Sequence, residues 1–399
     1  IKGALDGGIM LVFLSLILST LFSKDLSSSI WGMDGKLGTG IIAFVCILLV
    51  SLCARTFIKT AKDIKIALLV FMLGLSITNT LSILSFLGIN VWGFIPVYKD
   101  LGQKGLPLLR SAKTHLFVNF ILMLVNFGFL SDYVIDKVGK NTLLTIAIIS
   151  TILSAINIWI FSINQGIGLI ILFILLSVAM WILGIRRLKI ASVVSKNILF
   201  LIIGILLVIL IPTVILQIPS LREVIIPDSI QVVAQVSLGS DVSWIVAASV
   251  FVSSFARGLF GMGMDTYSIS YNLYKPLSQN LLQYNDVNFY YGASELFTQF
   301  TNNGLFWLVA WGVLGFLIIR TIKNGLTLLV LDLLIIFMYL GSFFAVYGVL
   351  ILLLLLVLIA LRSVLLDILS KGTEEKFVIK LWTANLRPDG ENGKLSYNL

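Results

Sequence analysis

The sequence is short of charged side chains, and this scarcity excludes a soluble protein. Only 12% of its 399 residues are Asp, Glu, Lys or Arg, whereas 59% are hydrophobic. A soluble domain needs more polar side chains than this to cover its surface. Together with a mean hydropathy of +1.06, this composition indicates an integral membrane protein.

Cysteine and histidine are nearly absent, which bears on metal and redox chemistry. The two cysteines, Cys46 and Cys53, lie seven residues apart on one predicted helix and form no Cys-x-x-Cys pair. The single histidine, His115, is far from both of them in the sequence. We interpret the cysteines as packing residues and expect neither a metal nor a cofactor.

The net charge of +9 is compatible with a nucleic-acid partner only if the basic residues form a patch. Here Lys and Arg concentrate in short loops between apolar runs, where they act as topological signals. We therefore expect no nucleic acid among the partners of this protein.

Apolar windows of about 20 residues, the length that crosses a bilayer core, predict ten spanning helices. They lie near residues 5–22, 40–57, 64–88, 114–131, 142–161, 166–185, 197–217, 303–320, 326–344 and 345–366. The expected fold is an all-α, polytopic transmembrane helical bundle. Residues 1–217 hold the first seven spans, a large hydrophilic loop covers 218–302, the last three spans occupy 303–366, and a polar tail follows at 367–399.

Basic residues fall in every second short loop, and this sets the orientation. The loops concerned carry Arg55, Lys59, Lys62 and Lys65, then Lys137 and Lys140, then Arg186, Arg187, Lys189 and Lys196, then Arg320 and Lys323. We expect these loops, both termini and the tail to be cytoplasmic. The loops 23–39, 89–113 and 218–302 then face outside.

The large loop has the composition of an exported surface, with three basic residues against six acidic ones. Trp244, Ala248, Phe251 and Phe255 recur in it at helical spacing, while Ser253 and Ser254 lie off that stripe. This pattern predicts an amphipathic helix near 242–257 that lies in the membrane interface, with the serines toward water. An eleventh span here would place Arg320 and Lys323 outside, so we reject it.

The same loop holds the densest run of chemically functional residues. Gly261 and Gly263 allow either an anion at their backbone amides or a turn that ends the preceding helix, and spacing alone favours the turn. Tyr267 and Tyr271 offer aromatic faces for sugars or for interfacial anchoring. Glu295 and Gln299 share one helical face, and a carboxylate at the mouth of a span is a candidate functional group.

Three segments of this region carry a family resemblance. They are Ser-Trp-Ile-Val-Ala-Ala at 243–248, Gly-Leu-Phe-Gly-Met-Gly-Met-Asp-Thr-Tyr at 258–267, and Ser-Glu-Leu-Phe-Thr-Gln-Phe-Thr-Asn-Asn-Gly-Leu at 294–305. With them the chain resembles the O-antigen ligase and polymerase family of membrane glycosyltransferases. Twelve spans are usual in that family, and ten here fit the loss of two before Ile1.

The resemblance implies transfer of a glycan from a polyprenyl diphosphate carrier to a glycan, lipid or protein acceptor, at the outer leaflet of the bacterial cytoplasmic membrane. In this setting we expect Glu295 to be the catalytic base. The substrate-binding residues would be Arg257, Gly261, Gly263, Asp265, Tyr267, Tyr271, Lys275 and Gln299, with Arg257 and Lys275 on the diphosphate. The sequence departs from the family at two positions: Ser243 replaces its Arg, and Ala293-Ser294 replaces its His-Asn pair.

A second cationic group lies at the end of the loop 89–113. Arg110, Lys113 and His115 are close in sequence, and we expect them to form an edge that attracts a lipid-linked diphosphate.

Two other functions stay open at this point. A secondary transporter would carry broken helices and intramembrane charges, and Asp332 is the only acid deep in a predicted span. The other alternative is a non-catalytic membrane anchor for a cytoplasmic domain beyond Leu399.

Overall fold

The computed structural model describes residues 2–32, 40–89, 112–136, 141–162, 238–281, 287–320, 326–343 and 349–370, together with Val91 and scattered residues between 174 and 220. This part of the chain forms helices and no strand, so the all-α prediction is confirmed for it. Arg110, most of the predicted spans 166–185 and 197–217, and the tail after Ser370 lie outside the described residues.

Eight of the ten predicted apolar segments coincide with long helices. These are α1 (Lys2–Leu21), α3 (Ile41–Phe57), α4 (Ala61–Phe86), α5 (Ala112–Asp136), α6 (Asn141–Ser162), α13 (Glu295–Arg320), α14 (Leu326–Gly341) and α15 (Val349–Ser370). Among the described helices, three are long and apolar enough to cross a membrane, at Asp63–Phe86, Leu143–Ser162 and Glu295–Arg320. That ten helices span a membrane stays a prediction.

Five shorter helices complete the described elements. They are α2 (Leu26–Trp31), α10 (Ser240–Ser253), α11 (Phe255–Phe260), α12 (Tyr267–Tyr274) and the 3-10 helix η3 (Leu277–Leu281). The chain divides into two compact units. The first unit comprises Ile1–Phe57, Val236–Thr321 and Met338–Ala360, and the second comprises Ile58–Gln235, Ile322–Phe337 and Leu361–Leu399.

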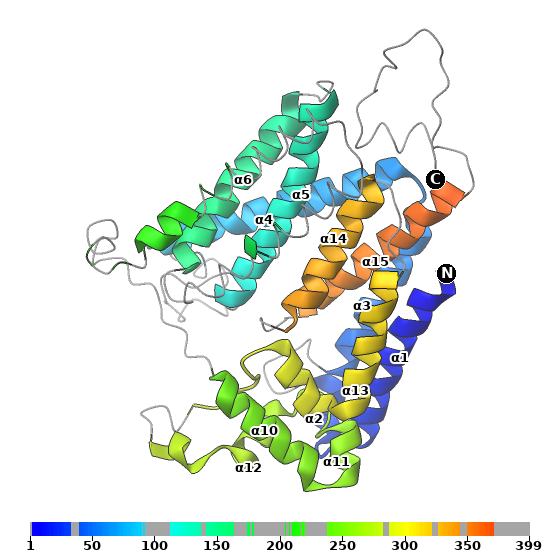
Figure 1. Cartoon of the computed structure of the whole chain (residues 1–399), viewed down its shortest axis with the longest axis vertical. Helices are drawn as coiled ribbons and strands as arrows, with labels where there is room; N and C mark the ends of the chain where they lie inside the picture. The colour runs from blue at the N-terminus through cyan, green and yellow to red at the C-terminus, as the bar shows by residue number, and fades with distance from the viewer. Residues whose placement is uncertain are drawn as a thin grey trace. The chain divides into compact units, whose positions relative to one another are not determined.

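The first unit is built around α13, which packs against α1, α10 and α11 (Figure 1). Gly8 of α1 permits the close approach of α1 to α13, because a Cβ there would lie 3.0 Å from the Leu317 side chain. Ser51 joins α3 to α15 by donating to the carbonyl of Leu356 at 3.0 Å. All of the outer-loop residues that the sequence singles out belong to this unit.

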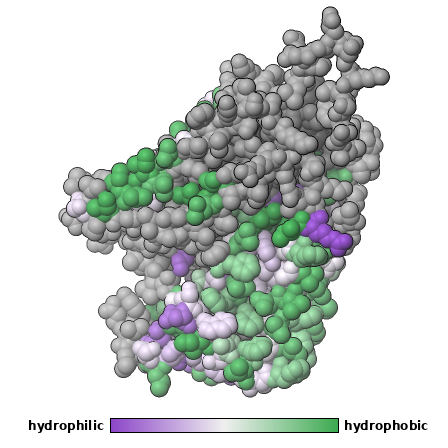
Figure 2. Space-filling model, in the orientation of Figure 1, coloured by the Kyte–Doolittle hydropathy of each residue, from purple (hydrophilic) through white to green (hydrophobic). Residues whose placement is uncertain are grey.

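Large apolar side chains are exposed on several helices of the first unit (Figure 2). They include Met10 and Leu14 on α1, Trp244 and Val252 on α10, and Phe316 and Ile319 on α13. Water-facing surfaces rarely collect so many large apolar groups. This surface fits contact with lipid.

The predicted interfacial helix 242–257 is broken in the structure. α10 ends at Ser253, Ser254 has extended backbone, and its side chain accepts the amide of Arg257 to begin α11. Trp244 and Phe255 are exposed, at 57% and 84%, although the Trp244 ring also makes an edge contact with Phe297 of α13. The opposite face of α10 is buried, with Val242, Ser243, Val246, Ala247 and Val250 against the rest of the unit.

In the second unit, α4, α5 and α6 pack together around a buried polar network. The Asn79 side chain donates to Asn119 at 2.7 Å, and the Asn157 side chain donates to the Asn79 carbonyl at 3.1 Å. Asp332, the acid that the sequence places deep in a predicted span, is buried and paired with Arg362, which is buried as well.

Candidate functional site

Two glycine backbones meet where α11 ends and α13 breaks. α13 is interrupted at Gly304, whose φ is 69°, and α11 ends at Gly261, whose φ is 73°. A Cβ on Gly261 would lie 2.2 Å from the Asn302 carbonyl oxygen, and one on Gly304 would lie 2.5 Å from the Leu259 carbonyl oxygen. Both the positive φ and the missing space require glycine at these two positions.

Backbone hydrogen bonds fasten the glycine turn to α13 immediately before the break. The amide of Met262 donates to Thr301 at 3.2 Å, and the amide of Gly263 donates to Asn302 at 2.9 Å. The amide of Gly261 donates to Arg257 at 2.8 Å. The two glycine amides are therefore engaged within the chain, which favours the helix-ending turn over an anion site at this place.

The segment after α1 packs on the other side of the turn. Its Lys24 amide donates to the Met262 carbonyl at 2.9 Å, and the Ser29 hydroxyl donates to the Met264 carbonyl at 2.8 Å. Arg257 also links the segment after α1 to the glycine turn. Its Nη1 donates to the carbonyls of Phe22 at 2.8 Å and Gly261 at 3.3 Å. In this conformation Arg257 braces two loops through its guanidinium group.

A cluster of hydroxyl groups surrounds the start of α13. The Ser243 hydroxyl donates to the Gly239 carbonyl at 2.8 Å and accepts the amide of Ala293 at 2.9 Å. The Thr298 hydroxyl accepts the amide of Gly292 at 3.0 Å. A Cβ on Gly292 would lie 3.0 Å from the Tyr267 hydroxyl oxygen and 3.3 Å from that of Ser243, so these groups converge on Gly292.

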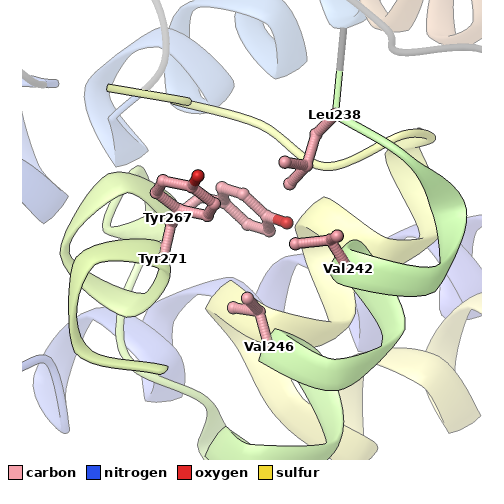
Figure 3. Packing of buried hydrophobic residues seen from close by; sticks show 5 residues of the cluster. All are labelled: Leu238, Val242, Val246, Tyr267 and Tyr271. Carbon is pink, nitrogen blue, oxygen red and sulfur yellow. The ribbon is translucent and has the colours of Figure 1, made fainter. Parts of the chain in front are cut away.

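Tyr267 and Tyr271 are interior residues. They belong to a buried hydrophobic cluster with Leu238, Val242 and Val246 (Figure 3). Because both side chains are fully buried, neither ring offers the exposed face for a sugar or for the membrane interface that the sequence suggests. Burial raises the pKa of Tyr267 to about 12, so its hydroxyl stays protonated at neutral pH.

Lys275 and Asp265 lie at the two ends of α12. The Lys275 Nζ is 5.6 Å from the centroid of the Tyr271 ring, a cation–π contact. Asp265 has a φ of 54°, a left-handed conformation that aspartate tolerates better than most residues, and it precedes the helix as a turn residue.

Glu295, Gln299 and Asn303 form a hydrogen-bonded row along one face of α13. The Gln299 Nε2 donates to Glu295 Oε1 at 2.6 Å, and the Asn303 Nδ2 donates to the Gln299 Oε1. The row orients the Gln299 amide, since its oxygen is held by Asn303 and its nitrogen faces the carboxylate. Sequence reasoning missed Asn303, although it stands four residues after Gln299 on the same helical face.

The predicted site residues fall into two groups in the first unit. Glu295 and Gln299 lie in the first turns of α13, the Tyr267 hydroxyl lies beside Gly292, and Tyr271 shares the buried cluster of Tyr267 and carries Lys275 over its ring. Arg257, Gly261 and Gly263 lie at the break, beside Asn302. Asn302 lies seven positions after Glu295 along α13, a rise of about 10 Å along the helix axis.

The described residues do not form the predicted cationic edge of Arg110, Lys113 and His115. His115 is buried in the second unit, and its Nε2 lies 2.9 Å from the Asn157 Oδ1. Because the Asn157 amide nitrogen donates to two carbonyls, its Oδ1 is the acceptor and Nε2 carries the proton. The partner is on α6, far away in sequence, which is why sequence reasoning placed His115 at the surface. Lys113 is half-buried, and Arg110 lies outside the described residues.

Within the described part of the chain, no three His, Cys, Asp or Glu side chains are grouped so that they could hold a metal ion. Comparison of the chain with protein-family models, with curated proteins and with solved structures gives no match.

Proposed function

We propose that this protein is a membrane glycosyltransferase of the O-antigen ligase and polymerase type. It would move a glycan from a polyprenyl diphosphate carrier to an acceptor at the outer leaflet. One observation carries the proposal: Ser243 and Ala293 are in hydrogen-bond contact although fifty residues separate them. These are the positions at which the family has its Arg and begins its His-Asn pair, and their contact supports a shared site built from both motifs.

The family's charged and imidazole side chains are replaced here, so neighbouring residues must supply the chemistry. Glu295 follows Ala293 by two residues, and Gln299 holds one of its carboxylate oxygens. We assign Glu295 as the base that takes the proton from the acceptor hydroxyl. The acceptor oxygen then bonds to the anomeric carbon, the bond from that carbon to the diphosphate breaks, and the diphosphate leaves with the electron pair.

The departing diphosphate needs a cation, because charge develops on it as the bond breaks. Lys275 is one candidate, and it lies at the end of α12 over the Tyr271 ring. Arg257 contributes only if its guanidinium group keeps the carbonyls of Phe22 and Gly261 and contacts phosphate through another nitrogen. Lys275 is therefore the stronger assignment.

The proposal includes a bilayer setting. It places about ten spans in the bacterial cytoplasmic membrane, residues 218–302 outside and both termini inside. The three long apolar helices, the apolar residues exposed on the first unit and the distribution of Lys and Arg support it.

A secondary transporter is the second candidate, because α13 is broken at Gly304 and the second unit buries an Asp332–Arg362 pair. Broken helices and buried charges are features of transporters. The carbonyls of Thr301 and Asn302 at this break, however, already accept bonds from Met262 and Gly263. This weighs against an ion site there.

The two candidates are separated in proteoliposomes of the purified protein. A labelled polyprenyl diphosphate-linked glycan and an outer acceptor should yield labelled acceptor and free polyprenyl diphosphate. Movement of labelled glycan across the bilayer without any transfer product would contradict the transferase and favour the transporter.

A further inference from the structure

We infer that Asn303 is a positioning residue that acts on Glu295 through Gln299. The row of three side chains holds one carboxylate oxygen of Glu295 in place and favours the ionised carboxylate, which is the form that can accept a proton. The inference rests on the proposed function for the role of Glu295 as the base. In it, Gln299 serves the base and not the substrate, as the resemblance implies.

The first argument is the direction of the two hydrogen bonds in the row. An ionised carboxylate only accepts hydrogen bonds, whereas an amide has one donor end and one acceptor end. The Gln299 Nε2 donates to Glu295 Oε1 at 2.6 Å, so the Gln299 Oε1 is left to accept the Asn303 Nδ2. Both bonds therefore run toward the carboxylate, and donors directed at a carboxylate favour its charged form.

The second argument is the burial of Asn303. Its side chain is 1% exposed, while Glu295 and Gln299 are half-buried. Among the described residues, the Asn303 side chain bonds to Gln299 alone, and its Oδ1 has no partner. A buried amide with one end unpaired costs free energy that an apolar side chain of the same size would not cost. The bond to Gln299 therefore explains an asparagine at this position better than packing does.

The third argument is that the far end of the row is anchored. Asn303 directly precedes the break in α13. The carbonyl of its neighbour Asn302 accepts the Gly263 amide at 2.9 Å and the Ser19 hydroxyl at 2.8 Å. These bonds fix the backbone that carries Asn303. Asn303 can therefore hold the half-buried Gln299 amide, which would otherwise be free to turn its oxygen toward the carboxylate.

The helices that pack against α13 carry other charged and titratable groups. These groups include Asp6 on α1, Asp241 on α10, Arg257 on α11, Tyr267 and Tyr271 on α12, and Lys275 at the end of α12. None of them changes in the variants below, so their influence on Glu295 is common to all of the measurements.

The test reads the protonation of Glu295 and does not depend on transfer. The purified full chain in nanodiscs is treated at a series of pH values with a hydrophobic carbodiimide, which reacts with protonated carboxyl groups. Mass spectrometry of the peptide then measures the labelling of Glu295. Asn303→Leu, which keeps the side-chain size and removes the donor, should raise the pH of half-maximal labelling by about 0.5–1 unit. Its melting temperature should not fall, and Asn303→Ala should shift the labelling in the same direction.

A double-mutant cycle shows whether Asn303 acts through Gln299. Gln299→Met removes the donor next to the carboxylate and should raise the pH of half-maximal labelling by about 1 unit. Asn303→Leu added to Gln299→Met should raise it no further. The matched control is Asn302→Ala, because this neighbouring asparagine is also buried and its side chain lies outside the row. It should leave the labelling as in the wild type.

Three results would overturn the inference. They are an unchanged labelling profile in both Asn303 variants, an equal shift in Asn302→Ala, and a full further shift when Asn303→Leu is added to Gln299→Met. The two proposals also fail separately. If labelling shifts as expected but Glu295→Gln transfers glycan at the wild-type rate, the row stands and the catalytic assignment falls. If transfer requires Glu295 and the labelling does not shift, only the role of Asn303 falls.

Discussion

The hydroxyl of Ser243 accepts the amide of Ala293 at 2.9 Å and donates to the carbonyl of Gly239 at 2.8 Å. The serine thereby joins the first turn of α10 to the segment that leads into α13. Its side chain is fully buried, so water cannot replace either bond.

Ser243→Ala should lower the free energy of unfolding by about 1–3 kcal/mol, because the Ala293 amide is left buried and unpaired. Thermal unfolding of the purified variant in detergent measures this. The control is Ser253→Ala on the same helix, where the serine is exposed and bonds only within the helix, and the change should stay within about 0.5 kcal/mol. Equal melting temperatures for the two variants would contradict the account.

Gly304→Ala should cost at least about 2 kcal/mol, because the positive φ strains any L side chain and the new Cβ meets the backbone of Leu259 and Gly261. Gly312→Ala is the control on the same helix, since a Cβ there meets nothing within 4 Å. That variant should gain about 0.5–1 kcal/mol from helix propensity. A stable Gly304→Ala protein would show that α13 is not broken at this position.

Tyr267 should contribute to the loss of stability at high pH. Its pKa is raised by burial to about 12 in the folded chain, against 10.0 for a free tyrosine. The stabilisation is complete below pH 10 and is lost as the pH rises toward 12, because the unfolded chain loses this proton first. Melting temperatures measured from pH 8 to 12 should fall less steeply for Tyr267→Phe than for wild type, and parallel curves would exclude the burial of this hydroxyl.

The predicted orientation is checked by cysteine labelling in intact cells. With Cys46 and Cys53 first replaced by serine, because both are exposed, Ser278→Cys should react with an impermeant maleimide and Lys59→Cys should not. If Lys59→Cys were labelled and Ser278→Cys were not, the true orientation would be the reverse of the predicted one.

The sequence predicts the long helices well, because apolar runs of the right length are visible without knowledge of tertiary contacts. It predicts α10 less well. One face of that helix carries Trp244 and Phe251 toward the outside, and the other carries Val242 and Val246 toward the protein. With both faces apolar, periodicity could not tell which of them is buried.

The site was partly predictable. The i to i+4 spacing places Glu295 beside Gln299, and their contact at 2.6 Å follows from helix geometry. The break at Gly304 and the hydrogen bond from the Gly263 amide to the Asn302 carbonyl could not be predicted, because hydropathy carries no information about a kink within an apolar helix. The buried position of His115 depends on Asn157, forty-two residues later.

The most direct measurement of the central claim is the transfer rate of Glu295→Gln in proteoliposomes supplied with a labelled lipid-linked glycan. Loss of a positioned base should lower the rate by about 10²–10⁴. The control is Asp241→Asn, which removes an exposed carboxylate from the first turn of α10 and should transfer as wild type does. Transfer by Glu295→Gln at the wild-type rate would show that Glu295 is not the base and would contradict the proposed mechanism.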